Sequence, residues 1–312
     1  MRYVIGRIQR LIIVLVIVTF ATFLLVNVLP GDVAYQLGGM EASEEQIERI
    51  RQTLGLDQPV LVRYFGWMAD LLRGDWGHSL LTGESVWEMI AQRFPISLQL
   101  MLMAQVMALA LAIPAGLATA WRAGGWLDRL VTSIGFATVS MPTFLIAILL
   151  IYLFSLHLGW LPAIGASRSG DPMSYLTHLI LPALAVGLRN GAGVARMTRA
   201  YVLEVMYQDF VRTARAKGVP PLRLALRHLL PNALLPVTTV AGVHIGGILG
   251  GAVVVETVFN WPGLGRLGFD AILQRDFNLL LGIILISSFM VIVVNLLVDL
   301  FQAWLDPRIE GR

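Results

Sequence analysis

Long apolar runs separated by shorter polar segments dominate the sequence. Six runs approach or exceed the roughly 20 residues that a helix needs to cross a bilayer. They cover residues 11–29, 96–121, 130–156, 178–199, 232–256 and 279–305. Pro114 and Met141-Pro142 interrupt two of the runs, and proline kinks membrane helices without forbidding them. The pattern predicts an all-α membrane protein with six transmembrane helices and both termini on one side.

Residues 31–93 form the one long polar segment, with ten acidic and five basic residues. Ser43 and Gln46 make a capping box, and Leu54-Gly55 is a plausible helix stop. A second helix is expected over residues 60–72, whose aromatic side chains favour the membrane–water interface. We interpret the segment as an extracytoplasmic helical insert that lies on the membrane surface.

A basic island, Leu203–Pro231, separates the fourth and fifth runs. Apolar residues recur at helical spacing over 203–214, which indicates an amphipathic helix. Gly218 interrupts this pattern, and Pro221 can start a second short helix because proline is accommodated in a first turn. We predict a helix–break–helix whose apolar face docks against a partner, the alternative being a solvated loop.

The distribution of charge orients the chain. Between Arg196 and Arg227 there are seven basic and two acidic residues, and Arg122 and Arg129 flank the turn between the second and third runs. The positive-inside rule therefore places both termini and the basic island in the cytoplasm and the acidic insert outside. A signal peptide is the alternative for the N-terminal run, but no small-residue cleavage site follows it.

Composition agrees with a membrane protein: 57% of residues are hydrophobic, 14% are charged and the mean hydropathy is +0.74. The net charge of +3 does not indicate a nucleic-acid partner, because the cations are concentrated in particular loops. Cysteine, HExxH and GxxxxGK[ST] are absent, so we expect no catalytic residue, metal site or cofactor in this chain. The GxGxxG match at 263–268 precedes a membrane run rather than a βαβ unit, which argues against dinucleotide binding.

Two features mark a candidate translocation pathway. Glycines recur at every fourth position of the fifth run, a stripe that lets another helix approach closely, either for packing alone or beside a pathway. Arg189 lies near the middle of the fourth run. At that depth, insertion of an arginine into the membrane has a free-energy cost of about 2.5–3.5 kcal/mol. Its guanidinium either binds an anionic group of the substrate or donates its hydrogen bonds to carbonyl groups of the protein. The candidates for the pathway or for helix packing are Arg189, Asn190, Gly242, Gly246, Gly250 and Glu256.

The basic island resembles the EAA loop of ABC importer permeases. The matching positions are Arg212-Thr213-Ala214, Gly218 and His228-Leu229-Leu230-Pro231, with departures at the family's glutamate and isoleucine. The stretch Asp209–Gly218, DFVRTARAKG, has the form found in the dipeptide, oligopeptide and nickel branch.

Further matches follow in the family's order along nearly the whole chain, and they resemble the first ("B"-type) permease subunit. They are Leu29-Pro30-Gly31-Asp32, Leu54-Gly55-Leu56-Asp57-Gln58-Pro59, Gly74-Asp75-Trp76-Gly77-His78-Ser79, Ser140-Met141-Pro142, Arg196-Met197-Thr198-Arg199, Glu256, Trp261-Pro262-Gly263-Leu264-Gly265-Arg266, Asn295-Leu296-Leu297-Val298-Asp299-Leu300 and Asp306-Pro307-Arg308.

The resemblance implies a type I ABC importer permease fold in a bacterial inner membrane. The expected parts are a first transmembrane helix (1–30), the insert (31–93), a five-helix permease core (94–306) with a coupling loop (201–231), and a cytoplasmic tail (307–312). It further implies a heterodimer with a homologous permease, two cytoplasmic ATPase subunits that bind ATP and Mg²⁺, and an extracytoplasmic substrate-binding protein. The residues expected to couple to the ATPases are Arg212, Thr213, Ala214, Arg215, Ala216, Lys217 and Gly218.

The implied function is non-enzymatic transport of dipeptides, oligopeptides or a related small solute, with nickel or glutathione as alternatives within the branch. A secondary carrier and an intramembrane enzyme are alternatives of other classes. The sequence shows no inverted repeat, which counts against the carrier. It also shows no paired catalytic groups within the membrane, which counts against the enzyme.

Overall fold

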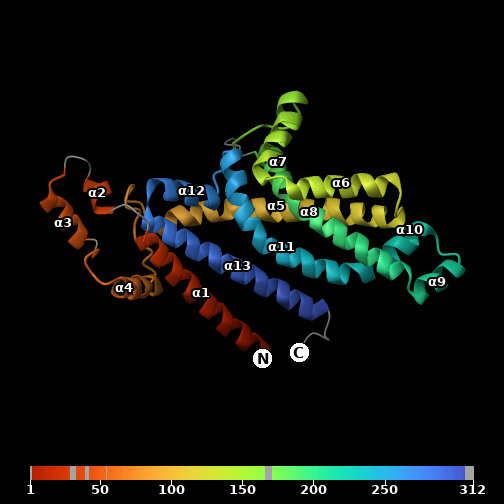
Figure 1. Cartoon of the computed structure of the whole chain (residues 1–312), viewed down its shortest axis with the longest axis horizontal. Coiled ribbons are helices and arrows are strands. Elements are labelled where there is room, and N and C mark those ends of the chain that lie inside the picture. The colour runs from red at the N-terminus through yellow and green to blue at the C-terminus, as the bar shows by residue number, and fades with distance from the viewer. Residues whose placement is uncertain (1, 29–32, 39–41, 54, 166–170, 306–312) are drawn as a thin grey trace. The chain divides into compact units, whose positions relative to one another are not determined.

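Helices account for nearly all regular structure in the computed structural model, which describes residues 2–28, 33–38, 42–53, 55–165 and 171–305 (Figure 1). The chain divides into two compact units. The first contains residues 1–95 and 267–292, and the second contains residues 96–266 and 293–312. Three helices have residues in both units. They are α5 (Val86–Trp121), α12 (Leu264–Gln274) and α13 (Phe277–Leu305).

The first unit also contains α1 (Arg2–Val28), α2 (Val33–Gly38), α3 (Glu44–Thr53) and α4 (Val60–Leu72). The capping box before α3 is confirmed: the Ser43 amide donates to the Gln46 side chain at 2.9 Å, and the Gln46 amide donates to the Ser43 hydroxyl at 3.3 Å. Gly55 follows α3 with φ +64°, as a helix stop requires. Local sequence chemistry therefore sets the ends of these short helices.

An aromatic cluster joins α4 to α1. Tyr64 of α4 is only 3% exposed, and its hydroxyl lies 3.0 Å from the Thr19 hydroxyl of α1. Its ring makes edge-to-face contacts with Phe20 and Phe23, with centroids 5.1 and 5.6 Å away. Phe65 is exposed. Tyr64 therefore stabilises the pair of helices, and the preference of the α4 aromatics for the membrane–water interface stays a prediction.

A polar loop in the first unit is held against the start of α13. The buried Asp276 carboxylate accepts hydrogen bonds from the Ser79 hydroxyl and, at 3.3 Å, from the Leu80 amide. The same carboxylate accepts the Leu279 amide at 3.3 Å, so it also caps α13. The Asn278 amide donates to the His78 carbonyl at 3.0 Å. His78 and Ser79 thus act in this loop as structural residues.

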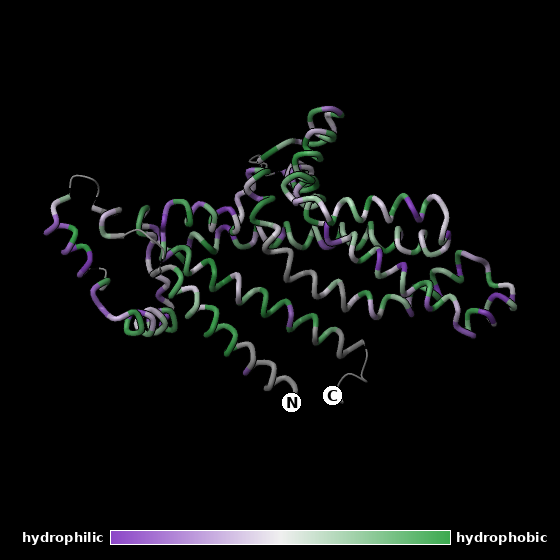
Figure 2. The backbone as a smooth tube through the Cα atoms, in the orientation of Figure 1, coloured by the Kyte–Doolittle hydropathy of each residue, from purple (hydrophilic) through white to green (hydrophobic). Residues whose placement is uncertain are grey.

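The second unit contains the remaining helices: α6 (Trp126–Ser140), α7 (Thr143–Leu150), η1 (Ile151–His157), α8 (Pro172–Met206), α9 (Asp209–Ala216), α10 (Pro221–Leu224), η2 (Ala225–Leu229) and α11 (Leu230–Val258). Here α8 packs against α6, α7 and α11 (Figure 1). Figure 2 shows hydrophilic residues gathered on α3 and around α9, whereas α7 and the described part of α13 are mainly hydrophobic.

Two described helices, Val86–Trp121 and Phe277–Val298, are long and apolar enough to cross a membrane. A third candidate is the broken pair formed by Trp126–Ser140 and Thr143–His157, which meet at 117°. The fourth long run, in α8, carries Arg189, Arg196 and Arg199 and is less apolar. The side chains of 243–250 in α11 lie outside the described residues, as do those of 2–8 in α1.

The break between α6 and α7 is larger than the kink that the sequence predicts. Met141 is extended, with φ −82° and ψ 139°, and Pro142 precedes the first residue of α7. Proline has no N–H to donate and disfavours helical backbone in the residue before it. By contrast, α5 continues through Pro114. The same residue type therefore ends one helix and is accommodated within another.

A helix that the sequence analysis does not predict lies between the fifth and sixth apolar runs. This helix, α12, was missed because its apolar residues fill less than three turns between two much longer runs. Its N-terminus is fixed by contacts with α5 and α11 that no local pattern reveals.

Candidate functional site

The first part of the basic island, residues 203–214, is divided between two helices where the sequence predicts one. The long helix α8 ends at Met206, Gln208 is extended with φ −74° and ψ 150°, and α9 begins at Asp209. Leu203 therefore belongs to α8, although its spacing from the apolar residues of α9 fits a single helix. The spacing misleads because apolar residues on both sides of the break pack into one cluster.

The apolar face of α9 packs against the chain itself. Val211 and Ala214 are buried together with Val202 and Val205 of α8 and Ala120 of α5. Leu224, Leu229 and Ala233 complete this cluster, which we call the loop core. The expectation that the apolar face of this segment docks into a partner is therefore wrong for these two residues of α9, because that face is already covered.

The outer face of α9 is exposed and cationic. Ala214 is 7% exposed, whereas the other six candidate coupling residues, Arg212, Thr213, Arg215, Ala216, Lys217 and Gly218, are all exposed. Two large apolar side chains flank them, with Tyr207 83% and Leu222 71% exposed. The arrangement offers a partner a surface on which apolar groups border positive charge.

Gly218 closes α9 in the way that the sequence predicts. Its φ is +73°, a left-handed conformation that glycine adopts without strain. The amide of Gly218 donates to Arg215 at 2.9 Å, and the Val219 amide donates to Ala214 at 3.2 Å. Pro221 then starts α10. The turn is therefore fixed by backbone hydrogen bonds and holds α9 in place.

A stripe of small residues that sequence reasoning overlooked joins α5 to α8. A Cβ atom on Gly187 would lie 2.8 Å from the Ala104 carbonyl oxygen, and one on Gly191 would lie 3.2 Å from the Ala108 carbonyl oxygen. Farther along, a Cβ on Gly116 would lie 2.6 Å from the Ala195 carbonyl oxygen. The contacts advance in the same direction along both helices, so α5 and α8 run parallel. Alanine and glycine at every fourth position of both helices are the signal that could have found this interface.

The predicted glycine stripe of α11 is only partly described. A Cβ on Gly242 would collide with Val298 of α13, which favours close packing at this position. The surroundings of Gly246 and Gly250 lie outside the described residues.

Glu256 is enclosed by its own chain. It is 0% exposed, and its carboxylate accepts the Ser97 hydroxyl at 2.5 Å and the Arg266 amide at 2.9 Å. The same Ser97 oxygen accepts the Leu264 amide at 2.7 Å. These two residues therefore cap the N-terminus of α12, where free amides and the helix dipole favour an anion. Glu256 thus serves packing in this structure.

The GxGxxG match supplies room for that carboxylate. A Cβ on Gly263 would overlap the Glu256 side chain, and a Cβ on Gly265 would lie 2.8 Å from Val253 Cα. The motif follows a helix, α11, and not the strand that a dinucleotide-binding fold places before it.

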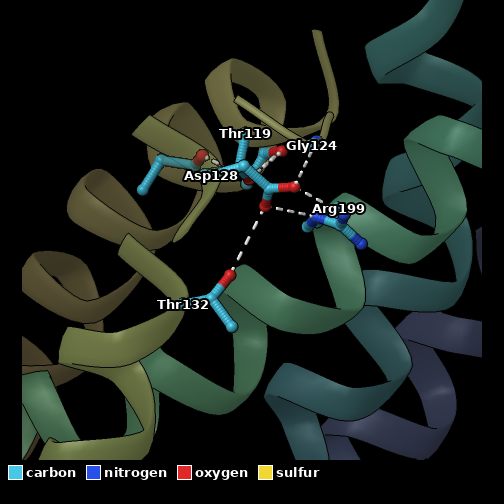
Figure 3. A network of polar contacts seen from close by, with 7 residues as sticks. Thr119, Gly124, Asp128, Thr132 and Arg199 are labelled. Atoms are coloured by element: carbon cyan, nitrogen blue, oxygen red, sulfur yellow. Dashed lines mark hydrogen bonds and ion pairs between the residues drawn. The ribbon is translucent and has the colours of Figure 1, made fainter. Parts of the chain in front are cut away.

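An ion pair between Asp128 and Arg199 connects α6 to α8 (Figure 3). Both contacts of the guanidinium with the carboxylate measure 2.7 Å. Asp128 also accepts the Gly124 amide at 2.9 Å and lies 3.4 Å from the Thr132 hydroxyl. The carboxylate is buried, and its two-point geometry with arginine is specific as well as strong. Sequence reasoning used Arg199 only as an orientation signal and missed the pair.

Arg189 is the central residue of α8 and is exposed. It donates one hydrogen bond, at 3.3 Å, to the carbonyl of Met141 at the break between α6 and α7. A guanidinium has five N–H donors, and this contact uses one of them. The neighbouring Asn190 is half-buried. The contact with a carbonyl agrees with one of the two sequence interpretations, and binding of an anionic group stays a prediction.

Metal ligands are not gathered in the part of the chain that the structure describes. No group of three or more His, Asp and Glu side chains there could hold a metal ion.

Comparison with known proteins identifies relatives over the whole length. A family model described as "Binding-protein-dependent transport system inner membrane component" matches residues 112–311, and its N-terminal companion matches residues 1–101. The glutathione transport system permease protein GsiC of Escherichia coli (strain K12) is 42% identical over 313 residues, covering 100% of each chain. A probable peptide ABC transporter permease protein, y4tP of Sinorhizobium fredii, is 37% identical over 99% of each.

Solved structures support the fold. The chain resembles one from inward-facing conformations of the MetNI methionine ABC transporter, with a TM-score of 0.58 and 17% identity, over 70% of this chain and 96% of that one. A second similarity is to an amino acid ABC transporter with histidines, with a TM-score of 0.51 and 17% identity, over 69% and 93% of the two chains.

Proposed function

Because the chain belongs to the family of binding-protein-dependent transport system inner membrane components and is the permease subunit of an ABC importer, we propose that it carries short peptides, glutathione among them. ATP hydrolysis belongs to partner ATPases, and the family implies a separate substrate-binding protein. The full-length similarity to a glutathione permease carries the proposal. A homologous second permease completes the pathway as a heterodimer, and this chain binds no cofactor itself, ATP and Mg²⁺ being held by the ATPases.

The proposed topology has six spans: α1, α5, the broken pair α6–α7 with η1, α8, α11 and α13. Both termini and the coupling loop (201–231) are cytoplasmic, and the insert (31–93) is extracytoplasmic. The parallel course of α5 and α8, with α6 and α7 between them in sequence, supports alternating crossings. The basic residues after Arg196 support the orientation. The proposed parts are 1–30, 31–93, 94–306 and the tail 307–312, which lies outside the described residues.

The exposed face of α9 is the proposed contact with the ATPases. Arg212, Arg215 and Lys217 provide charge there, and Tyr207 provides an exposed apolar anchor. Because Val211 is buried in the loop core, a displacement of α9 is passed on to α5, α8 and α11 as a rigid-body movement. The outer face of α9 thus contacts the ATPases, and its inner face passes their movement to the helices of the loop core.

Cysteine cross-linking tests this division in the assembled transporter. Ala216→Cys on the outer face is expected to cross-link to an ATPase subunit, with a yield that changes when ATP is added. Ala214→Cys is the matched control, because this position is buried two residues away. A cross-link from position 214 that equals or exceeds the one from position 216, or no ATP-sensitive cross-link at 216, would contradict the proposal.

Arg189 is the proposed contact for a substrate carboxylate, with Asn190 beside it. Support comes from its central position in α8 and its free donors. An unpaired cation at membrane depth is costly, so a functional role is the default interpretation. Gly242, Gly246, Gly250 and Glu256 are assigned to helix packing beside this pathway.

Uptake by proteoliposomes that contain the whole transporter and its binding protein identifies the substrate. Glutathione and dipeptides are expected to enter in an ATP-dependent manner, and nickel is the competing substrate. Arg189→Gln should reduce uptake of an anionic peptide more than uptake of a neutral, C-terminally amidated one. An equal loss for both would refute the carboxylate contact. Uptake by the purified chain alone, driven by an ion gradient, would instead indicate a secondary carrier.

A further inference from the structure

A groove of about 620 Å³ lies between α5, α6 and α8, within the second unit. Much of its wall is apolar, and one end is basic. The apolar residues include Leu111, Ile134, Phe136, Val139 and Leu188, and the basic ones are Arg129, Arg196 and Arg199.

The basic end carries charge that the protein does not neutralise. Arg199 is paired with Asp128 at 2.7 Å, so its charge is compensated. Arg129 and Arg196 are both exposed, and neither has a carboxylate partner among the residues that the structure describes. The end of the groove therefore presents two uncompensated positive charges beside an apolar wall.

The polarity of the groove follows depth in the membrane. Arg196 lies seven residues after the central Arg189 of α8, which is about 10 Å along the helix axis at 1.5 Å per residue. Half of the hydrocarbon thickness is about 15 Å. In the proposed topology, on which this inference rests, the basic end thus lies near the cytoplasmic headgroups and Val139 lies deeper.

We propose that this groove binds an anionic phospholipid of the cytoplasmic leaflet. Its phosphate lies between Arg129 and Arg196, and one acyl chain lies along the apolar face of α6. Basic pockets between transmembrane helices on the cytoplasmic side suit anionic headgroups because the phosphate accepts hydrogen bonds from arginine while the chains stay in apolar surroundings. A zwitterionic lipid lacks the net charge that would balance two arginines.

Native mass spectrometry of the whole transporter tests the site. The complex is exchanged from detergent into nanodiscs of phosphatidylglycerol mixed with phosphatidylcholine, and the lipids retained after release are counted. One basic residue near the surface is worth roughly a fivefold preference, so Arg129→Gln/Arg196→Gln should reduce retained phosphatidylglycerol about thirtyfold. Arg49→Gln/Arg73→Gln, which removes the same charge from exposed positions in the insert, should retain it.

A second variant blocks the groove without changing its charge. Val139→Trp fills the apolar wall and should also lose the lipid, whereas Ile148→Trp, an exposed position on α7 outside the groove, should not. Equal retention of both lipids by the native complex would overturn the proposal, as would full retention by the arginine double variant. So would a high-yield cross-link from Ser133→Cys to the second permease, which would make the groove a subunit interface.

The same samples separate this inference from the proposed function. Co-purification of the ATPases with the chain is scored before lipids are counted. If the complex forms but shows no lipid selectivity, only the lipid site is contradicted. If no complex forms, the proposed coupling role is contradicted.

Discussion

Arg199 of α8 holds Asp128, at the start of α6, through two contacts of 2.7 Å each. The pair joins the turn that follows α5 to the end of α8 that leads into α9. A buried ion pair adds little to the free energy of unfolding, but a buried carboxylate that loses its cation is strongly destabilising. The contact therefore fixes the position of the turn more than it adds stability. The ion pair thus links the turn between α5 and α6 to the part of α8 that leads into α9.

Removing one member of this pair should destabilise the permease. Arg199→Gln leaves the buried Asp128 charge without its partner, and we expect a loss of about 2 kcal/mol. Arg199→Lys should recover only part of it, because lysine cannot make the two-point contact. Thermal unfolding of the assembled transporter in detergent measures the effect. Arg73→Gln, which breaks an exposed ion pair with Asp70, should leave the unfolding temperature unchanged.

Close packing of α8 on α5 predicts a graded effect of added methyl groups. Gly187→Ala places a Cβ 2.8 Å from a backbone oxygen and should cost about 1–3 kcal/mol, whereas Gly191→Ala, at 3.2 Å, should cost less. Gly251→Ala is the control, because no atom of the described residues lies within 4 Å of its added Cβ. Denaturant unfolding ranks the three variants. A larger effect at position 251 than at position 187 would contradict the described interface.

The buried Glu256 predicts local loss of α12. Glu256→Ala leaves the Ser97 hydroxyl and the Arg266 amide without their acceptor, at a cost of about 1–3 kcal/mol. Hydrogen exchange should therefore rise at the start of α12. Glu88→Ala, an exposed glutamate in the first turn of α5, is the control. Unchanged exchange over 264–268 in the first variant would show that this cap is dispensable.

The two faces of α9 should respond differently to charge. Arg215→Glu lies on the outer face and should weaken ATPase binding about tenfold, with little change in thermal stability, since rim charges act mainly on association. Val211→Asp lies in the loop core and should lower the unfolding temperature of the permease itself. Binding of the purified ATPases, measured beside thermal unfolding, distinguishes the two effects. Equal stability of both variants would argue against the loop core.

Local patterns identified a large part of the fold. The capping box at Ser43 and the break at Gly218 occur where the sequence predicts them, because each depends on residues within a single turn. The long helices α5, α8, α11 and α13 overlap the predicted runs, with ends that shift by up to ten residues at Val86. Such ends are set by contacts that hydropathy does not encode.

The sequence by itself determined the helical membrane character and, through motifs in a fixed order, the family. Apolar periodicity and turn chemistry are local properties, so they can be read directly along the chain. Only the tertiary structure decided that Ala214 faces inward, that Glu256 caps α12 and that Arg199 pairs with Asp128. Each of these assignments depends on a partner 10 to 159 residues away or on the choice between two faces of one helix. Periodicity shows that a helix has an apolar face, but only packing determines what covers it.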